Sequence, residues 1–320
     1  MNRPRYLPDN FTLALITVVA VASLLPARGS GAVFFDWLTT FAIALLFFLH
    51  GVKLSRQAIL AGIGHWRLHA LVFAATFVMF PAFGLLLKPL LLPLVTPQIY
   101  TGVLYLCVLP ATVQSAVVFT AIARGNVAAA VCSASGSTML GVFITPLLVN
   151  LIVLPNGGAS TSLDSIEKIL LQLLVPFIAG HLLRPWLGGW SERHARVVSL
   201  VDRGAILLVV YTAFSAAVIE GLWNQVPVSA LAGLLVVCAV ILSLALISTT
   251  LAARRLGFNT ADEITIVFCG SKKGLANGIP IAKVLFSAQA VGTIVLPLML
   301  FHQMQLMVCA VLARRYARRE

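Results

Sequence analysis

The sequence predicts an all-α, multi-pass membrane protein, and three observations carry this prediction. Of the 320 residues, 60% are apolar and only 10% are charged, with a mean hydropathy of +1.01. A soluble protein needs many more charged side chains to cover its surface. The apolar residues are collected in ten runs, and the basic residues fall unequally between alternate connecting segments. Long runs without period-2 alternation favour transmembrane helices over a β-barrel.

Ten transmembrane helices are expected because a helix needs about 20 mostly apolar residues to cross a bilayer. Pro26, the segment 88–97 and the segment 155–158 fall between runs, where helix-breaking residues are expected. The polar stretches are too short to fold alone, so residues 1–320 are expected to form a single membrane domain. The predicted spans are residues 11–26, 34–51, 67–87, 98–122, 127–153, 166–186, 198–219, 227–251, 261–286 and 288–313.

The net charge of +12 is explained by membrane orientation rather than by a nucleic-acid partner. With the N-terminus inside, the cytoplasmic segments hold 16 of the 22 Lys and Arg residues and the outer segments hold four. This division favours an even number of spans with both termini in the cytoplasm. We expect the basic stretch 188–203 to be a loop at the lipid headgroups. The other two basic residues, Lys272 and Lys273, lie inside the ninth span.

Sequence motifs for enzymatic chemistry, metal binding or nucleotide binding are missing. The five cysteines lie in apolar runs without a CxxC spacing, which argues against a zinc site and paired disulfides. No HExxH, GxSxG or carboxylate pair occurs, and the segment 270–274 lacks the spacing of a phosphate-binding loop. We therefore expect no catalytic residue, no metal site and no cofactor. The expected partners are the lipid bilayer and a small solute.

Span four contains helix-breaking and polar residues at mid-membrane depth. Pro110 lacks an N–H and clashes with the preceding helical turn, so it kinks or opens the helix. Thr112, Gln114 and Ser115 bring side-chain donors and acceptors to the same depth. Polar or broken segments inside a membrane helix are where function is sought.

Span nine is also predicted to be broken, and it contains two adjacent lysines. A charge at the centre of a span costs about 2.5–3.5 kcal/mol on insertion scales, so the lysines need a compensating role. Adjacent helix residues point about 100° apart, so one lysine can face a central cavity while the other snorkels or pairs elsewhere. The predicted break contains Gly270, Gly274, Gly278 and Pro280, and its polar side chains are Ser271, Lys272, Lys273 and Asn277.

The two broken spans occupy the same place in each half of five spans. Such a pair is typical of an inverted-repeat secondary transporter, so we predict repeats at about 11–153 and 166–313. Gly and Pro are also common in membrane helices, and Ser and Thr often join helices. For Thr112, Ser115 and Ser271 a packing role is therefore the alternative interpretation. In span five, a packing face is favoured for four residues spaced by four: Ala129, Ser133, Ser137 and Gly141.

These segments resemble the bile acid:sodium symporter family, and more narrowly its bacterial bile-acid-symporter-like branch of sodium-dependent transporters. The resemblance covers essentially the whole chain and is carried by LPATVQS (109–115), ARGNVA (123–128) and CGSKKGLANGIP (269–280). It implies two inverted five-helix repeats in which broken helices four and nine cross. It also implies a panel domain of spans 1, 2, 6 and 7 that moves against a core domain of spans 3–5 and 8–10, in a bacterial inner membrane.

The resemblance implies a sodium site whose ligands carry over incompletely. The family's Ser-Asn pair after the helix-four proline matches the window 114–116. Its helix-five Ser and Thr fall on Ala130 and Ala134, and its helix-three Gln falls on Thr76. Three of these positions therefore lack the family's side chain.

The helix-nine pattern of the family, Glu-x-Gly-x-Gln-Asn-x-Gly, departs most. Matching Gly274 puts Val267 at the glutamate, Ser271 at the glutamine and Lys272 at the asparagine. A gap of one residue moves the glutamate to Phe268, so the central carboxylate is missing in either alignment. Lysines bring a positive charge to the place where the family has a negative one. Whether sodium binds to this protein is therefore left open.

Two hypotheses follow from the positive charge in span nine. In the first, the ammonium of Lys272 or Lys273 occupies the sodium position and bridges the broken ends of helices four and nine. In the second, one lysine changes its protonation during transport and couples transport to protons. The positive ends of half-helix dipoles add to the field, so the crossing is expected to attract an anion.

The expected function is secondary active transport, by alternating access, of a small organic anion such as a bile-acid-like compound or another carboxylate or sulfate. Sodium coupling, proton coupling and uncoupled transport are alternatives. A regulatory or scaffolding membrane protein that kept the fold is the alternative of another class. The predicted substrate and ion site consists of Thr76, Thr112, Gln114, Ser115, Ser271, Lys272, Lys273 and Asn277.

Overall fold

The computed structural model describes residues 10–53, 63–153 and 170–319, and regular structure within these ranges is helical throughout. In the first half, the predicted third span is one continuous rod with a π-helical turn in its middle, and the fourth span is divided in two. The elements are α1 (Asn10–Leu24), α2 (Gly29–Lys53), η1 (Ile63–His65), α4 (Trp66–Ala74), η2 (Ala75–Met79), α5 (Phe80–Leu86), α6 (Lys88–Leu91), η3 (Leu92–Leu94), α7 (Pro97–Val108), α8 (Gln114–Ile122), α9 (Val127–Leu148) and η4 (Val149–Val153).

The second half follows the same plan, with a divided helix in the place of the predicted ninth span. Long uninterrupted helices stand on either side of that divided helix in the sequence. The elements are η5 (Leu170–Leu174), α11 (Val175–Leu182), α12 (Arg184–Arg193), α13 (Ala195–Ile219), α14 (Leu222–Gln225), α15 (Val228–Arg255), α16 (Thr260–Gly270), α17 (Leu275–Leu285) and α18 (Ala288–Ala317).

Six helices in the described part of the chain are long and apolar enough to cross a membrane, which confirms the prediction of an all-helical protein with several apolar spans. The first and sixth predicted spans correspond to shorter apolar helices, Leu13–Leu24 and Leu171–Leu182. Spans four and nine are each split into two short helices. The six long ones are Gly29–Lys53, Trp66–Leu86, Val127–Val153, Ala195–Ile219, Val228–Arg255 and Ala288–Ala317.

The prediction of a loop at residues 188–203 is wrong, because α12 and the start of α13 cover nearly all of that stretch. Side-chain interactions one turn apart stabilise α12. The rings of Trp190 and His194 stack with centroids 5.0 Å apart, and Arg193 Nε donates to the carbonyl of Gly189 at 3.0 Å. Such local pairs favour helix even where the composition is polar.

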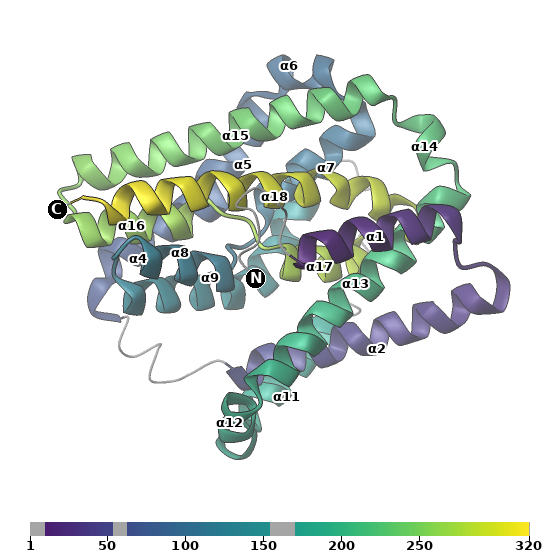
Figure 1. Ribbon diagram of the computed structural model, residues 1–320, viewed down its shortest axis with the longest axis horizontal. Coiled ribbons are helices and arrows are strands. Elements are labelled where there is room, and N and C mark those ends of the chain that lie inside the picture. Colours follow the sequence, from purple (N-terminus) through teal and green to yellow (C-terminus); the bar gives the residue numbers. More distant parts are fainter. Residues whose placement is uncertain (1–9, 54–62, 154–169, 320) are drawn as a thin grey trace, which may run out of the picture.

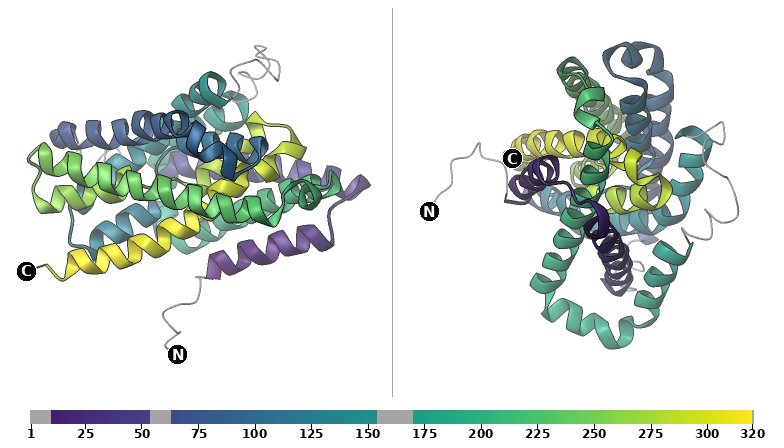
Figure 2. Two further views of the ribbon diagram at one scale, coloured as in Figure 1. Left: turned by 90° about the horizontal axis from the view of Figure 1, so that it is seen from above. Right: turned by 90° about the vertical axis from the view of Figure 1, so that its right-hand side faces the viewer.

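The helices form two groups (Figure 1). We call α1, α2, α11, α12 and α13 the first bundle, and the elements from α4 to η4 together with α15 to α18 the second bundle. The contacts between the bundles are made mainly by α13, which packs against α17 and α18. Figures 1 and 2 show α15 and α18 side by side along the long axis of the molecule.

Glycines bring α2 and α11 into direct backbone contact in the first bundle. A Cβ atom at Gly51 would lie 2.0 Å from the carbonyl oxygen of Phe177, and one at Gly180 would lie 2.0 Å from that of Phe48. Small residues allow this close approach, which is the usual source of packing energy between membrane helices. The two glycines therefore fix how α2 and α11 pack.

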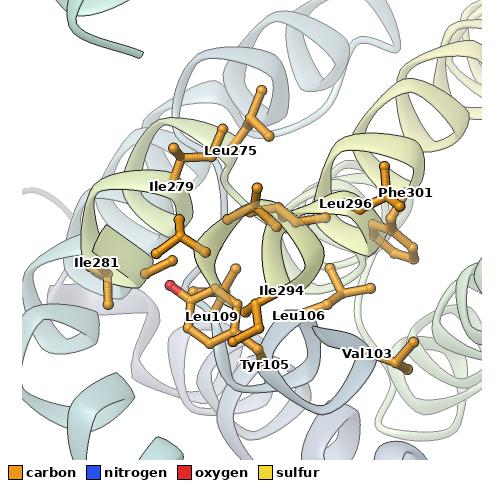
Figure 3. Close-up of a cluster of buried hydrophobic side chains, with 14 of the residues drawn as sticks. Val103, Tyr105, Leu106, Leu109, Leu275, Ile279, Ile281, Ile294, Leu296 and Phe301 are labelled. Carbon is orange, nitrogen blue, oxygen red and sulfur yellow. The ribbon is translucent and has the colours of Figure 1, made fainter. Parts of the chain in front are cut away.

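The interior is apolar around the divided helices, and the outside is apolar as well. Figure 3 shows Tyr105 and Leu106 of α7 packed with Ile279 of α17 and Phe301 of α18 in one buried cluster. On the outer side of α9 and η4, large apolar side chains such as Leu147 are 70% exposed. Apolar exposure of this extent on long helices suits a lipid environment rather than water.

Replacing Gly180 by Ala is expected to lower stability by about 1–3 kcal/mol, because the added methyl group forces the α2 and α11 backbones apart. Gly204→Ala is the matched control, since no atom lies within 4 Å of its Cβ position. The control is expected to be neutral or slightly stabilising, because Ala favours helix over Gly. Thermal unfolding in detergent measures both, and equal melting temperatures would contradict the close packing.

Candidate transport site at the two helix breaks

The two breaks in the helices lie against each other. Residues 109–113 separate α7 from α8, and residues 271–274 separate α16 from α17. The backbone N–H of Gly274 donates to the carbonyl of Pro110 at 3.0 Å, which joins the breaks directly. A Cβ atom at Gly274 would lie 3.3 Å from the carbonyl oxygen of Ala111, so the contact favours a small residue.

The predicted break of span nine is too long at its C-terminal side. Gly270 ends α16 and Gly274 is the N-cap of α17, but Gly278 and Pro280 lie inside α17. Pro280 lies in the middle of this helix and removes one backbone hydrogen bond, which tertiary packing tolerates. Gly278 packs closely against two leucines, because a Cβ atom would lie 2.5 Å from a methyl group of Leu298 and 2.6 Å from one of Leu109. Its carbonyl accepts a hydrogen bond from Tyr105 Oη at 2.5 Å.

The ammonium of Lys273 is fully buried and is held by three backbone carbonyls. It donates to Thr76 at 2.9 Å, to Cys107 at 2.9 Å and to Leu109 at 2.7 Å. Its Nζ atom lies 4.1 Å from the centroid of the Phe80 ring, a cation–π contact. The carbonyls of Cys107 and Leu109 belong to the C-terminal end of α7, whose partial negative charge favours a cation. Lys273 therefore bridges the two breaks.

The ammonium of Lys272 is also buried, but it has fewer polar partners. It donates to the carbonyl of Ser115 in the first turn of α8 at 3.0 Å. Its other neighbours are aromatic: Nζ lies 3.9 Å from the ring centroid of Phe119 and 5.0 Å from that of Phe268. This ammonium is thus the less satisfied of the two, because one carbonyl and two ring faces replace a complete hydrogen-bond shell.

The side chain of Gln305 holds the second break, and sequence reasoning missed it. Its amide oxygen accepts from the backbone N–H of Lys273 at 2.9 Å, and its amide nitrogen donates to the Lys273 carbonyl at 2.9 Å. The same nitrogen lies 2.8 Å from Nδ1 of His302 on α18. A polar residue within an apolar span was the available signal, because a fully buried amide needs partners.

Hydroxyl groups of α9 hold the first break in a comparable way. Ser137 Oγ accepts from the N–H of Ala111 at 3.0 Å, and Thr145 Oγ1 donates to the carbonyl of Val108 at 3.0 Å. A Cβ atom at Gly141 would lie 2.5 Å from the Pro110 ring. The face of span five that was predicted to pack therefore packs on the break of span four.

The other predicted site residues are not all brought together. Thr76 lies in η2, where its carbonyl binds Lys273 while its hydroxyl donates to the carbonyl one turn earlier. Ser271 likewise uses its hydroxyl within α16, at 2.6 Å from the Val267 carbonyl. Thr76 thus contributes its main-chain carbonyl to the site, whereas the hydroxyls of Thr76 and Ser271 bond within their own helices.

Four further predicted residues lie on the α8 side of the breaks or away from them. The hydroxyls of Ser115 and Thr112 are 3.5 Å apart. Gln114 begins α8 with an exposed side chain, and within the described residues it makes no hydrogen bond to either ammonium. Asn277 donates to Thr138 Oγ1 at 3.2 Å, and its buried Oδ1 has no partner in the described ranges.

The residues at the breaks do not fit a bound sodium ion in this conformation. The three carbonyls gathered there accept hydrogen bonds from the Lys273 ammonium, and the described residues place no carboxylate within 4.0 Å of either ammonium. Asp262 and Glu263 lie at the start of α16 and are engaged there. Asn126 and Asn259 donate to Asp262, while Arg254 and Tyr316 donate to Glu263.

Gln305→Leu is expected to destabilise the protein by about 1–3 kcal/mol for each backbone group that it leaves without a partner. The two groups are the N–H and the carbonyl of Lys273, both inside the protein. Gln98→Leu on the exposed side of α7 is the matched control and is expected to be close to neutral. Thermal unfolding in detergent measures the difference, and a variant as stable as the control would exclude the clamp.

Comparison with known proteins places the chain among membrane transporters. It matches the SBF-like CPA transporter family (DUF4137) over residues 9–318. It is 68% identical to "Uncharacterized protein PA2026" of Pseudomonas aeruginosa, over 100% of this chain and 96% of that protein. It is 59% identical to "Putative symporter YfeH" of Escherichia coli, over 97% and 93%. It is 28% identical to sodium/bile acid cotransporter 7 of Mus musculus, over 94% and 90%. The chain therefore belongs to the SBF-like CPA transporter family, as a multi-pass membrane transporter and not an enzyme.

Proposed function

We propose that this transporter carries a small organic anion by alternating access between its two bundles. The observation that carries the proposal is the pair of buried ammonium groups where the two helix breaks meet. In a low-dielectric interior, two cations without a carboxylate neighbour create a field that attracts an anion and repels a free cation. The name of the mouse relative, a sodium/bile acid cotransporter, supports a carboxylate or sulfate substrate.

The two lysines have different roles in this proposal. Lys273 is a built-in cation that holds the ends of α7 and α16 together, since three carbonyls satisfy its ammonium. Lys272 attracts the substrate. Its ammonium donates to only one carbonyl, so it can donate a further hydrogen bond to an anion. The hydroxyls of Thr112 and Ser115 beside it supply donors to the same anion. Gln114 and Asn277 extend the polar surface on either side.

Movement of the bundles gives the substrate access to this site. The first bundle corresponds to the panel domain of the family and the second to the core domain. Both lysines are fully buried, so an exchange of solutes requires α13 to shift against α17 and α18. The packing supports two inverted repeats. The second span of the first half, α2, packs on the first span of the second half, α11, and likewise α1 packs on α13. Exchanging the two halves therefore converts one of these pairs into the other. Alternating access then follows from rocking one bundle against the other.

Ion pairs support the proposed orientation, with both termini in the cytoplasm of a bacterial inner membrane. With the N-terminus inside, Lys53 after the second predicted span and Asp202 near the start of the seventh lie on the cytoplasmic side, and they pair. Asp36 near the start of the second span and Lys283 near the end of the ninth lie on the outer side, and they pair. Each of these ion pairs therefore joins two residues that the proposed orientation places on the same side of the membrane.

The position of the Lys273 ammonium bears on the coupling ion. Because this group fills the place that a cation would take at the breaks, transport is proposed to need no sodium at that position. Proton coupling, uncoupled transport, sodium binding elsewhere and a regulatory membrane protein are the competing hypotheses. Uptake by purified protein in liposomes, with sodium and proton gradients varied separately, distinguishes them. A regulatory protein gives no uptake of any anion under any gradient.

Lys272→Met is expected to reduce uptake of carboxylates and sulfates, including taurocholate, by at least about tenfold, because a charge-assisted hydrogen bond contributes about 1.5–3 kcal/mol. The matched control is Lys88→Met on α6, away from both breaks, which is expected to transport normally. The assay is initial-rate uptake in liposomes that contain equal amounts of folded protein. Uptake by Lys272→Met at the rate of the control would overturn the assigned role.

Lys273→Ala is expected to create a cation site from the three carbonyls that the ammonium leaves unpaired. Sodium or methylammonium added to this variant is then expected to raise its melting temperature, whereas the unaltered protein responds to neither. Lys272→Ala is the matched control, since only one carbonyl loses its partner there. A loss of stability in Lys273→Ala that no cation restores would count against the built-in cation.

A further inference from the structure

An ion pair joins one bundle to the other, at a different place from the ion pairs that Glu263 makes with Arg254 and Arg319. Lys283 lies in the last turn of α17, in the second bundle, and Asp36 lies in α2, in the first bundle. Their side chains are 2.5 Å apart. Of the ion pairs in the described part of the chain, this is the one that joins the two bundles, because Lys53–Asp202 lies within the first bundle and the pairs of Glu263 lie within the second.

A cavity of about 390 Å³ lies beside this ion pair, between α2, α13 and the connection from α17 to α18. Its volume is in the range of pockets that bind small molecules. The polar side chains that line it are those of Asp36, Thr212, Ser215, Glu220, Lys283 and Gln289, and the rest of its wall is mostly apolar. Lys283 is the basic residue among the described residues of this wall.

A buried hydroxyl in the wall has no partner within the described residues. Ser215 lines the cavity and is 2% exposed, and its Oγ atom is buried and makes no hydrogen bond within the described residues. A buried hydroxyl without a partner is unfavourable, so turning this side chain toward an acceptor oxygen of a ligand in the cavity would be favourable. This observation is independent of the ion pair.

The two members of the ion pair differ in how much they need each other. The side chain of Lys283 is only 11% exposed, whereas that of Asp36 is 55% exposed. A buried ammonium requires an anionic partner, but a half-exposed carboxylate is hydrated by water when it is released. An anion that enters the cavity can therefore replace Asp36 at Lys283 without leaving either charge unsatisfied. The Asp36 carboxylate itself demonstrates that the site accommodates such a group.

We propose that this cavity is a second, outer binding site for amphipathic organic monoanions, in which the ligand's carboxylate or sulfate displaces Asp36 from Lys283 and thereby releases α17 from α2. The inference rests on the proposed function, since it supplies the anion with a way toward the helix breaks. The apolar wall accommodates the body of the ligand. Lys283 supplies one positive charge at this wall, which matches a monoanion better than a dianion.

The displaced ion pair also acts as a latch between the bundles. While Asp36 holds Lys283, α2 and α17 are tied together at this end. When a ligand takes the place of Asp36, this ion pair no longer joins the bundles, and the main contacts left between them in the described residues are those of α13 with α17 and α18. Ligand arrival and opening of this end are thus one event, which suits an alternating-access carrier.

The test uses Ala216→Cys, which places a thiol in the cavity wall, and a membrane-impermeant maleimide applied to the full-length protein in liposomes. The parent protein provides the background from the five native cysteines. Cholate is the anionic probe, and its methyl ester, which has the same body without the charge, is the matched neutral probe. We expect cholate to slow labelling of the introduced thiol and the ester to leave the rate unchanged.

Two changes at the ion pair, each made together with Ala216→Cys, separate the latch from the anion site. Asp36→Asn is expected to speed labelling about fivefold, the most that a partly exposed ion pair supplies. Asp202→Asn, which breaks a similar pair within the first bundle, is expected to change nothing. The exchange of charges, Asp36→Lys with Lys283→Asp, is expected to restore slow labelling but to abolish protection by cholate, because the buried member is then anionic.

Equal labelling with and without cholate would overturn the binding site, and so would equal protection by cholate and its methyl ester. Unchanged labelling of the Asp36→Asn variant would overturn the latch. These outcomes are independent of uptake. If Lys272→Met transports normally while cholate still protects the introduced thiol, the proposed function fails and the outer site stands. If Lys272→Met loses uptake and cholate gives no protection, the reverse holds.

Discussion

The hydrogen bonds from the Lys273 ammonium to three carbonyls are the interaction on which the centre of this transporter depends. Two helices that end in the middle of a membrane leave main-chain groups without partners, and lipid cannot satisfy them. One ammonium collects two of these carbonyls, those of Cys107 and Leu109, together with the carbonyl of Thr76 in η2, and its charge is matched by the negative end of α7. The carbonyls stabilise the buried ammonium, and the ammonium stabilises the carbonyls at the helix break. Neither a buried lysine nor a broken helix is stable alone in this place.

The helix that follows each divided span holds the break of that span in position. α9 uses two hydroxyls, those of Ser137 and Thr145, on the break between α7 and α8. α18 uses one amide, that of Gln305, on both main-chain groups of Lys273. The chemistry differs between the halves, but the task is the same. The second bundle therefore has a polar centre whose groups are tied to one another, as a part that moves as a unit requires.

Charge is distributed along the molecule in three layers. At one end, Glu263 binds Arg254 and Tyr316 within the second bundle and strengthens it. In the centre, two ammonium groups are buried without carboxylates among the described residues around them. At the other end, Lys283 and Asp36 tie the bundles together. Of the ion pairs in the described ranges, only this last one is placed so that its rupture would free one bundle from the other, because the others lie inside a bundle.

Much of the candidate site was readable from the sequence because membrane burial makes polar residues conspicuous. Lys272 and Lys273 stand out in an apolar span, and Pro110, Gly270 and Gly274 fall at or beside the interruptions of the helices. Gly278 and Pro280 were assigned to the break incorrectly, because composition alone does not distinguish a helix interruption from a close packing contact. The long amphipathic stretch at 188–203 was assigned to a loop for a similar reason, since pairs such as Trp190 and His194 act only once a helix forms.

The sequence by itself determined that the chain is a helical membrane protein, where its apolar helices run, and that two lysines and two interruptions lie inside them. Hydropathy and charge suffice for this, because the bilayer acts on each span separately. Only the tertiary structure decided that the Lys273 ammonium donates to main-chain carbonyls, that the Lys272 ammonium contacts aromatic rings, and that Gln305 binds the main chain of Lys273. Those outcomes depend on which helix ends meet, and contacts between residues 32 to 197 positions apart are not encoded in any local pattern.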